Sequence, residues 1–280
     1  MENLSKTMAM YGQMPSKGQS MKTGQTSPVS NTEEAFQHCK ATCMGIDKCP
    51  YSGNIPYQLT LEGLKKIGIE GKYAGMIFTY KCPLFEEYAL LQKRKQRVSR
   101  VLGPLATHTF ENFDSSRNTK AFQMAKKYIE SKAWKQGGWL ILYGSYGTGK
   151  THLLSAIIHE AIMLGASAKF ANLANITTLD FESAKSAIAD LTSYDLVGID
   201  DFGVEIGQNW LSPHIFRLFD DLNESSKGIV MTTNMPLGGL QELLGNRIAD
   251  RIAERAIAIE LTGESMRKNL RSKFTSWFKE

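Results

Sequence analysis

The segment WLILYGSYGTGKTHLL, from Trp139 to Leu154, constrains the fold of this chain more than any other part of its sequence. Its apolar first part ends in glycine, which is typical of a buried strand. From Thr151 onward the apolar residues recur at helical spacing, and Gly165 predicts where the helix ends. A strand, a glycine-rich turn and a helix in this order predict an α/β domain built around a parallel sheet.

The glycine-rich turn matches the pattern G-x-x-x-x-G-K-[ST] at every position from Gly144 to Thr151. Its glycines let successive backbone N–H groups point at phosphate oxygens, and the following helix directs its positive end at the same anion. Lys150 would then reach the β- and γ-phosphates, and the Thr151 hydroxyl would bind Mg²⁺. We therefore predict an ATP site made of Gly144, Ser145, Tyr146, Gly147, Thr148, Gly149, Lys150, Thr151 and His152. The pattern leaves open whether Ser145 and Tyr146 shape the pocket or face solvent.

Four further strand-like segments lie downstream of the turn, at residues 168–173, 194–201, 228–234 and 255–261. Segments with helical spacing of apolar residues separate them. Strands that alternate with crossover helices predict a parallel sheet covered on both faces, here of five strands.

Polar residues end two of these strands. YDLVGIDDFG places Asp200 and Asp201 at the end of one strand, and VMTTN places Asn234 at the end of another. Asp200 is predicted to hold Mg²⁺, and Asp201 to orient and deprotonate an attacking water. Asn234 could reach both that water and the γ-phosphate. The alternatives are that the acidic pair caps the next helix and that Asn234 belongs to a turn.

Arginines recur in the C-terminal part of the chain. In GNRIADRIAER, Arg247, Arg251 and Arg255 are four residues apart and share one helix face. They form either a solvated, ion-paired face or an arginine finger that stabilises charge at a neighbouring subunit's γ-phosphate. Arg267, in GESMRKN, is placed to contact the nucleotide of its own subunit.

All four cysteines lie in the N-terminal third, at Cys39, Cys43, Cys49 and Cys82. In a cytoplasmic chain metal ligation is a better interpretation than disulfides, and four thiolates can close a tetrahedral Zn²⁺ site. The spacing C-x3-C-x5-C is looser than paired C-x2-C motifs. An iron–sulfur cluster and unligated thiols therefore stay open, as does replacement of one thiolate by His38.

Composition and charge divide the chain into four expected parts. Residues 1–36 are rich in Ser, Thr, Gly, Gln and Met, and we expect a disordered tail there. Residues 37–83 form the cysteine-marked module, which is expected to be a small metal-binding domain. Residues 84–104 form a basic helical linker, in which five of the last eight positions up to Arg100 are basic, and 105–280 form the α/β domain. The basic run is either a solvated face or a phosphate-contacting patch.

The overall composition excludes some classes of protein. Hydrophobic residues make up 42% of the chain and charged residues 22%, as in soluble globular proteins. No run approaches the roughly 18 apolar residues of a membrane span, and the N-terminus lacks the apolar core of a secretory signal. We expect a cytoplasmic protein without a membrane partner. The net charge of +5 is compatible with a nucleic-acid partner but does not require one.

Taken in order, GSYGTGKTHL, YDLVGIDDFG, VMTTN, GNRIADRIAER and GESMR resemble the AAA+ ATPases of the DnaC and IstB group, as does the lead-in TFENFD. The resemblance covers roughly residues 105–270. It implies that Lys150 and Thr151 are the Walker A residues, that Asp200 and Asp201 are the Walker B pair, and that Asn234 is sensor 1. It further implies that Arg251 is the arginine finger, with Arg247 as a competitor, and that Arg267 is sensor 2.

The resemblance also implies a function. A cysteine-rich module ahead of such an ATPase looks like the helicase loaders of Gram-positive and phage type, whereas IstB-type proteins usually begin with a helical part. The implied activity is slow, ATP-dependent loading of a hexameric replicative helicase onto single-stranded DNA by a homo-oligomer that shares ATP between its subunits. The alternatives are an IstB-like helper of DNA transposition and a non-hydrolysing ATP switch or adaptor.

Two features depart from the family pattern. The family often has an arginine near the end of the helix before the sensor strand, where this chain has DDLNESSKG. An intersubunit contact at that place is therefore not expected. The second sensor motif is SMR rather than SYR, so that an aromatic ring is lost while the cation of Arg267 is kept.

Overall fold

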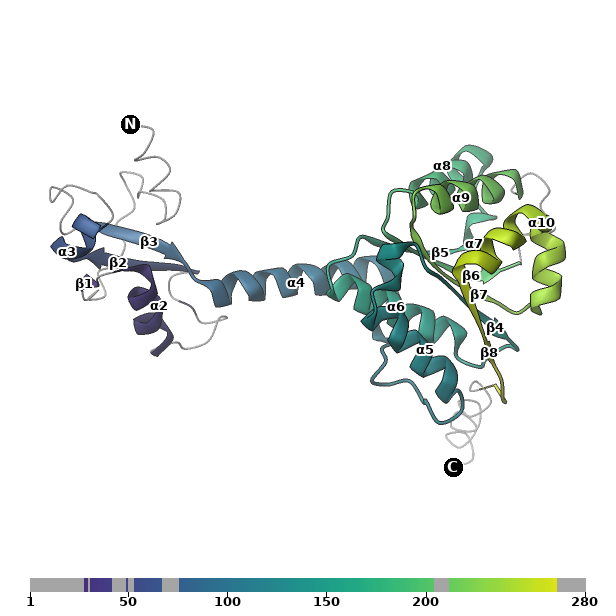
Figure 1. Cartoon of the computed structure of the whole chain (residues 1–280), viewed down its shortest axis with the longest axis horizontal. Coiled ribbons are helices and arrows are strands. Elements are labelled where there is room, and N and C mark those ends of the chain that lie inside the picture. The colour runs from purple at the N-terminus through teal and green to yellow at the C-terminus, as the bar shows by residue number, and fades with distance from the viewer. Residues whose placement is uncertain are drawn as a thin grey trace, which may run out of the picture. The chain divides into compact units, whose positions relative to one another are not determined.

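The computed structural model describes residues 28–29, 31–41, 49, 53–66, 76–203 and 212–265. They divide into two compact units between Lys93 and Arg94, inside the segment predicted to be the basic linker. Residues 84–102 of that segment lie in one long helix, α4 (Pro83–Leu102). Figure 1 shows the elements of both units.

The N-terminal unit contains a three-stranded sheet in the order β1-β2-β3, formed by Pro28–Val29, Asn54–Leu59 and Ile77–Lys81. β1 runs parallel to β2, and β2 runs antiparallel to β3. The helices α2 (Thr32–Ala41) and α3 (Leu61–Lys66) both contact strand β2 of this sheet. β1 and the start of α2 lie before residue 37, within the part predicted to be a disordered tail.

Alternate residues of β2 point to one face of this sheet, as the period of two in a strand requires. Tyr57 and Leu59 are buried there with Ala35, Leu64 and Phe78 in a small apolar core. Among the described residues, this core comprises a handful of side chains.

The C-terminal unit is built on a sheet of five parallel strands in the order β5-β6-β7-β4-β8. The strands are β4 (Trp139–Gly144), β5 (Ala168–Asn172), β6 (Leu196–Phe202), β7 (Gly228–Thr233) and β8 (Ala256–Leu261). The five-stranded parallel sheet predicted from the sequence is confirmed. β4 lies between β7 and β8, so both of its neighbouring strands come from the C-terminal part of the sequence.

Helices cover both faces of this sheet (Figure 1). They are α5 (Thr119–Glu130), α6 (Lys150–Met163), α7 (Leu173–Ile176), α8 (Phe181–Leu191), α9 (Ser212–Glu224) and α10 (Leu237–Arg255), with the short 3-10 turns η3 (Gly103–Thr107) and η4 (Ala133–Gln136). Two apolar cores result, one on each face. Leu140 and Leu142 of β4 enter the core with α5 and α6, whereas Trp139 and Ile141 enter the core with α8 and α9. The strand therefore has both faces covered, which explains its continuous apolar sequence.

Candidate nucleotide site

The glycine-rich turn links the end of β4 to the start of α6. Gly144 has φ +132° and Gly147 has φ +76°, and side chains disfavour both conformations. A β-carbon on Gly144 would lie 2.2 Å from the carbonyl oxygen of Leu261, and one on Gly147 would lie 2.1 Å from Oγ of Ser265. Both positions therefore require glycine for space as well as for conformation.

Lys150 is the first residue of α6, and its side chain is buried. Its Nζ donates hydrogen bonds to the carbonyl oxygens of Gly144 at 2.9 Å and Ser145 at 2.7 Å. The ammonium is therefore confined against the inside of the loop, where phosphate oxygens can replace these carbonyls as stronger, charged acceptors. With the start of α6 beside it, the loop fits a triphosphate.

Asp200 is a buried residue of β6 and lies beside the loop. Thr151 of α6 donates its hydroxyl to Oδ1 of Asp200 at 2.9 Å, and Thr232 of β7 donates to the same oxygen at 2.7 Å. Burial raises the pKa of Asp200 above its ordinary value, and the charge of Asp201 raises it further. A carboxylate and a hydroxyl oxygen form the hard donor set that Mg²⁺ prefers, so the pair fits the predicted cation.

A β-bulge in β6 contains both Asp200 and Asp201. Ile199 pairs with Met231 and Phe202 pairs with Thr233, so β6 has one residue more than β7 across this interval. Asp201 takes up the extra residue with φ +53°, a left-handed conformation that aspartate tolerates better than most side chains. The bulge turns the two consecutive aspartates away from the strict alternation of a strand.

Thr232 holds this bulge in place. It is fully buried, and its Oγ1 accepts a hydrogen bond from the backbone N–H of Asp201 at 2.9 Å while donating to Asp200. Asn234 then donates its side-chain N–H to Oδ1 of Asp201 at 3.3 Å. One hydrogen-bonded row thus lies at the carboxyl end of the sheet and comprises Thr151, Asp200, Thr232, Asp201 and Asn234. The structure brings these predicted residues together and adds Thr232, which the sequence argument missed although two threonines stand out in an apolar strand.

Two other predicted residues of the loop have different surroundings. Tyr146 is 72% exposed. His152 turns toward the lead-in segment: its ring stacks on His108 with centroids 4.6 Å apart, and its Nε2 lies 2.9 Å from the carbonyl oxygen of Thr109. Burial, and then the nearby charge of His152, lower the pKa of His108. His152 therefore joins the lead-in segment to α6 by its side chain.

The arginines of α10 do not share one environment. Arg251 forms a hydrogen-bonded ion pair with Asp220 of α9, and its side chain is 20% exposed. Arg255 ends the helix with its guanidinium close to Gly137. The side chain of Arg247 and the whole of Arg267 lie outside the described part of the chain. Arg251 must leave Asp220 if it is to act as a finger.

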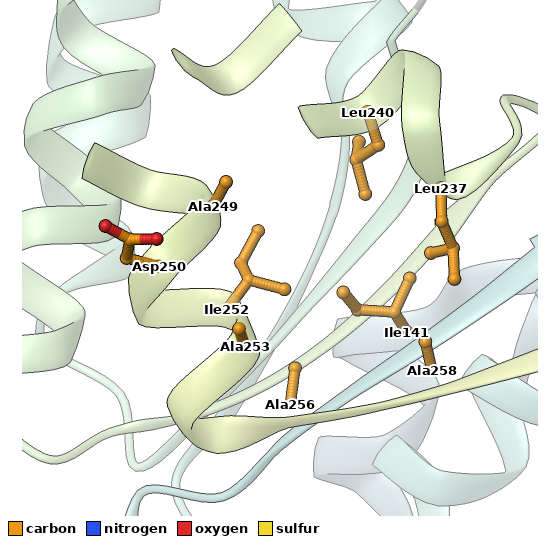
Figure 2. Close-up of a pocket in the computed structure, with 9 residues that line it drawn as sticks. All are labelled: Ile141, Leu237, Leu240, Ala249, Asp250, Ile252, Ala253, Ala256 and Ala258. Carbon is orange, nitrogen blue, oxygen red and sulfur yellow. The ribbon is translucent and has the colours of Figure 1, made fainter. Parts of the chain in front are cut away.

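Residues of α10 other than these arginines line a mostly apolar pocket of about 270 Å³ (Figure 2). Ile252 and Ala253 of the helix face Ile141 of β4 and Ala258 of β8 there, and Asp250 is the charged side chain among the nine drawn. No residue of the phosphate loop or of the acidic pair lines it. The pocket is therefore separate from the candidate nucleotide site.

The cysteines give no metal site that can be inspected. Cys39 lies in α2, Cys82 lies between β3 and α4, and Cys43 falls outside the described residues. Within the described ranges no cluster of three or more His, Cys, Asp or Glu side chains could hold a metal. The four-thiolate site therefore stays a prediction, as does the participation of His38, whose side chain is not described.

Comparison with known proteins identifies the family. The sequence family described as "IstB-like ATP binding protein" matches residues 77–274. The chain belongs to this family. The IstB-like protein has the α/β fold with a five-stranded parallel sheet that is typical of AAA+ proteins, as the resemblance of its motifs implied. None of its described helices is both long and apolar enough to cross a membrane.

The chain is also similar to a replicative helicase loader and to a replication initiator protein. The "Replicative helicase loader DnaC" of Escherichia coli strain K12 is 28% identical over 153 residues, which cover 51% of this chain and 62% of the relative. The AMPPCP-bound DnaA of Aquifex aeolicus matches with a TM-score of 0.50 and 25% identity over 64% of this chain and 57% of that one. A DnaC helicase loader structure matches with a TM-score of 0.51 at 18% identity, over 57% and 99% respectively, and shows the shared fold alone.

Proposed function

We propose that this IstB-like protein hydrolyses ATP at the site between β4, β6 and β7. The observation that carries the proposal is the hydrogen-bonded row that leads from Thr151 through Asp200 and Thr232 to Asp201 and Asn234. Mg²⁺, when bound with ATP, supplies charge neutralisation at the phosphates. Thr151 and Asp200 would hold it, and Lys150 would bind the phosphate oxygens.

Asp201 is the proposed general base. Its bulged backbone and the hydrogen bond from Asn234 fix its carboxylate at the carboxyl end of the sheet, where it can accept a proton from a water molecule. Aspartate is one methylene shorter than glutamate, so we expect slow turnover. Asp201→Asn should retain ATP binding and lose hydrolysis. The matched control is Asp221→Asn, because Asp221 pairs with exposed Arg217 on α9. If the control loses hydrolysis equally, Asp201 is not the base.

The second half of the site is proposed to come from another copy of the chain. Arg251 is the candidate finger, with Arg247 as the alternative and Arg267 as the contact from the same copy. Asp220 would hold the Arg251 guanidinium ready until a neighbouring phosphate replaces it. A mixture of Asp201→Asn and Arg251→Ala copies tests this, because one kind of interface in the mixture has both intact halves. Recovery of hydrolysis supports a shared site, and no recovery argues for a site completed within one copy.

We further propose that the protein loads a hexameric replicative helicase onto single-stranded DNA in the cytoplasm. The similarity to the DnaC relative supports this role, and the basic residues of α4 offer phosphate contacts. Because the chain spans 62% of that relative, the partner needs its own test. ATP-dependent co-purification with a replicative helicase is the expected result.

The family description favours a second candidate, an IstB-like ATPase that assists DNA transposition. Co-purification with a transposase instead of the helicase would establish it. Capture of neither, together with absence of ATP turnover in the parent protein, would leave the ATP switch or adaptor.

We also propose that Cys39, Cys43, Cys49 and Cys82 bind one Zn²⁺ in the N-terminal unit, whose apolar core is small. Elemental analysis should find one zinc per chain, and the double variant Cys43→Ser and Cys49→Ser should lose it. If the analysis finds iron and the protein absorbs visible light, the cysteines hold an iron–sulfur cluster instead of zinc. If neither metal is found, the thiols are unligated.

A further inference from the structure

Asn118 is a buried polar residue that no motif of the site includes. It precedes α5 and is only 7% exposed. An asparagine in this position ordinarily accepts a hydrogen bond from an N–H of the first helical turn. Here its side chain makes no such cap. Its amide is used elsewhere.

The amide of Asn118 joins two segments that lie far apart in the sequence. Its Nδ2 donates to the carbonyl oxygen of Thr148 in the phosphate loop at 3.3 Å and to the carbonyl oxygen of Thr262 at 3.2 Å. Its Oδ1 accepts from the backbone N–H of Thr262 at 3.0 Å. One buried side chain therefore satisfies both backbone polar groups of Thr262 and one carbonyl of the loop.

The segment held by Asn118 lies directly on the phosphate loop. We name Thr262–Ser265, which follows β8, the post-β8 segment. The carbonyl oxygen of Leu261, just before it, and Oγ of Ser265, at its end, occupy the space where β-carbons on Gly144 and Gly147 would stand. In the sequence, Arg267 follows two residues later. The loop thus contacts the segment that leads to the proposed second sensor, so a movement of the loop would act on that segment directly.

Phosphate bound at Lys150 would compete with hydrogen bonds inside this loop. The Nζ of Lys150 donates hydrogen bonds to the carbonyl oxygens of Gly144 and Ser145, which phosphate oxygens would replace as charged acceptors. The hydroxyl of Thr148 donates to the same carbonyl of Ser145, at 2.9 Å. The carbonyl that Asn118 contacts therefore belongs to Thr148, whose hydroxyl shares the Ser145 carbonyl with Lys150.

We propose that Asn118 is a positioning residue that couples the phosphate loop to the post-β8 segment, so that nucleotide binding at the loop orders the segment leading to Arg267. The coupling rests on the proposed nucleotide site. It requires no contact between Asn118 and ATP, since the amide acts through the carbonyl oxygens of Thr148 and Thr262.

The test compares Asn118→Asp with a matched variant, Asn112→Asp, in the full-length protein. The aspartate at 118 keeps an acceptor for the Thr262 N–H but turns an oxygen toward two carbonyl oxygens. Asn112 lies upstream of Asn118 in the lead-in TFENFD, and its amide makes local hydrogen bonds with Thr107 and Thr109. The readouts are hydrogen exchange at residues 144–149 and 262–265, with and without a non-hydrolysable ATP analogue, together with kcat and KM for ATP.

In the parent and in Asn112→Asp, the analogue should protect both segments. In Asn118→Asp it should still protect the loop while protection of the post-β8 segment is lost. ATP affinity should fall by about three- to tenfold, the scale of one or two neutral hydrogen bonds. The kcat should fall more than KM rises, because the segment leads to a residue that acts during hydrolysis.

Asn118→Ser provides a second variant if the aspartate prevents folding, because a hydroxyl can restore one of the three hydrogen bonds. Equal, nucleotide-dependent protection of residues 262–265 in the Asn118 variants and the parent would overturn the coupling. So would a parent that binds the analogue without any change at residues 262–265. A parent that binds no nucleotide would instead overturn the proposed function.

Discussion

Replacing Thr232 by valine removes one hydroxyl and leaves the shape of a fully buried side chain almost unchanged. That hydroxyl donates to Oδ1 of Asp200 at 2.7 Å and accepts the backbone N–H of Asp201 at 2.9 Å. Asp200 keeps the hydrogen bond from Thr151, whereas the Asp201 N–H loses this acceptor. The substitution therefore releases the side of the bulge that positions the proposed base.

Two terms set the size of the effect. A hydrogen bond to a charged group contributes about 1.5–3 kcal/mol, and a buried N–H left without an acceptor costs about 1–3 kcal/mol. Relaxation of the bulge and the added methyl group offset part of this loss. We expect the free energy of unfolding of Thr232→Val to fall by about 2–4 kcal/mol, a range in which the protein can still be assayed in its folded state.

Thr233→Val is the matched control. Thr233 is on the same strand and is equally buried, and its hydroxyl also makes two hydrogen bonds, to the carbonyl oxygen of Phe202 at 2.8 Å and from the N–H of Met235 at 3.1 Å. Denaturant unfolding and steady-state ATP hydrolysis are measured for both variants. Both should lose stability, whereas kcat should fall at least about tenfold further in Thr232→Val, as expected when a positioned base is displaced.

Thr232→Ser should recover most of the kcat, because it restores the hydroxyl at the cost of one methyl group. The reasoning is refuted if Thr232→Val loses stability as calculated and yet hydrolyses ATP as fast as Thr233→Val. In that case the bulge does not depend on this hydroxyl for the position of Asp201.

Three further predictions follow from single sites. Asp200→Asn should raise the melting temperature of the nucleotide-free protein at neutral pH. The raised pKa means that the ionised carboxylate is less favourable in the folded chain than in the unfolded chain, and the amide removes that charge. A fall in melting temperature would contradict this. His108 has a lowered pKa, so as pH drops below the ordinary value of 6.5 the unfolded chain is protonated at His108 before the folded chain, and stability should fall. His108→Gln should therefore flatten a plot of melting temperature against pH. An unchanged slope would contradict this prediction. Gly147→Ala should abolish nucleotide binding, as measured by titration with an ATP analogue. Gly103→Ala should retain binding, because Gly103 also has a positive φ but a β-carbon there would have nothing within 4 Å. Equal losses of binding in the two variants would show that crowding at the loop is unimportant.

The sequence by itself predicted the five parallel strands, because buried strands in a parallel sheet read as continuous apolar runs. It also placed Lys150, Thr151, Asp200, Asp201 and Asn234 at strand ends and helix starts. The carboxyl ends of parallel strands share one edge of the sheet, so local patterns sufficed to predict that these residues meet. Their catalytic roles stay predictions.

The tertiary structure decided what depends on pairing between distant segments. The bulge at Asp201 and its support by Thr232 arise from the register of β6 against β7, which periodicity along one strand cannot show. The ion pair of Arg251 with Asp220 and the stacking of His152 on His108 join residues of different elements. These contacts give side chains of known sequence an environment that the sequence did not predict.

Asn118 shows the same division most clearly. From the sequence, an asparagine ahead of a helix predicts a cap, which is a local hydrogen bond. In the fold, its amide bonds instead with Thr148, 30 residues away, and with Thr262, 144 residues away. The sequence determined where phosphate-binding groups stand along the chain, because that chemistry follows local backbone conformation. Only the packing of β8 beside β4 decided which other segment this asparagine holds against the loop.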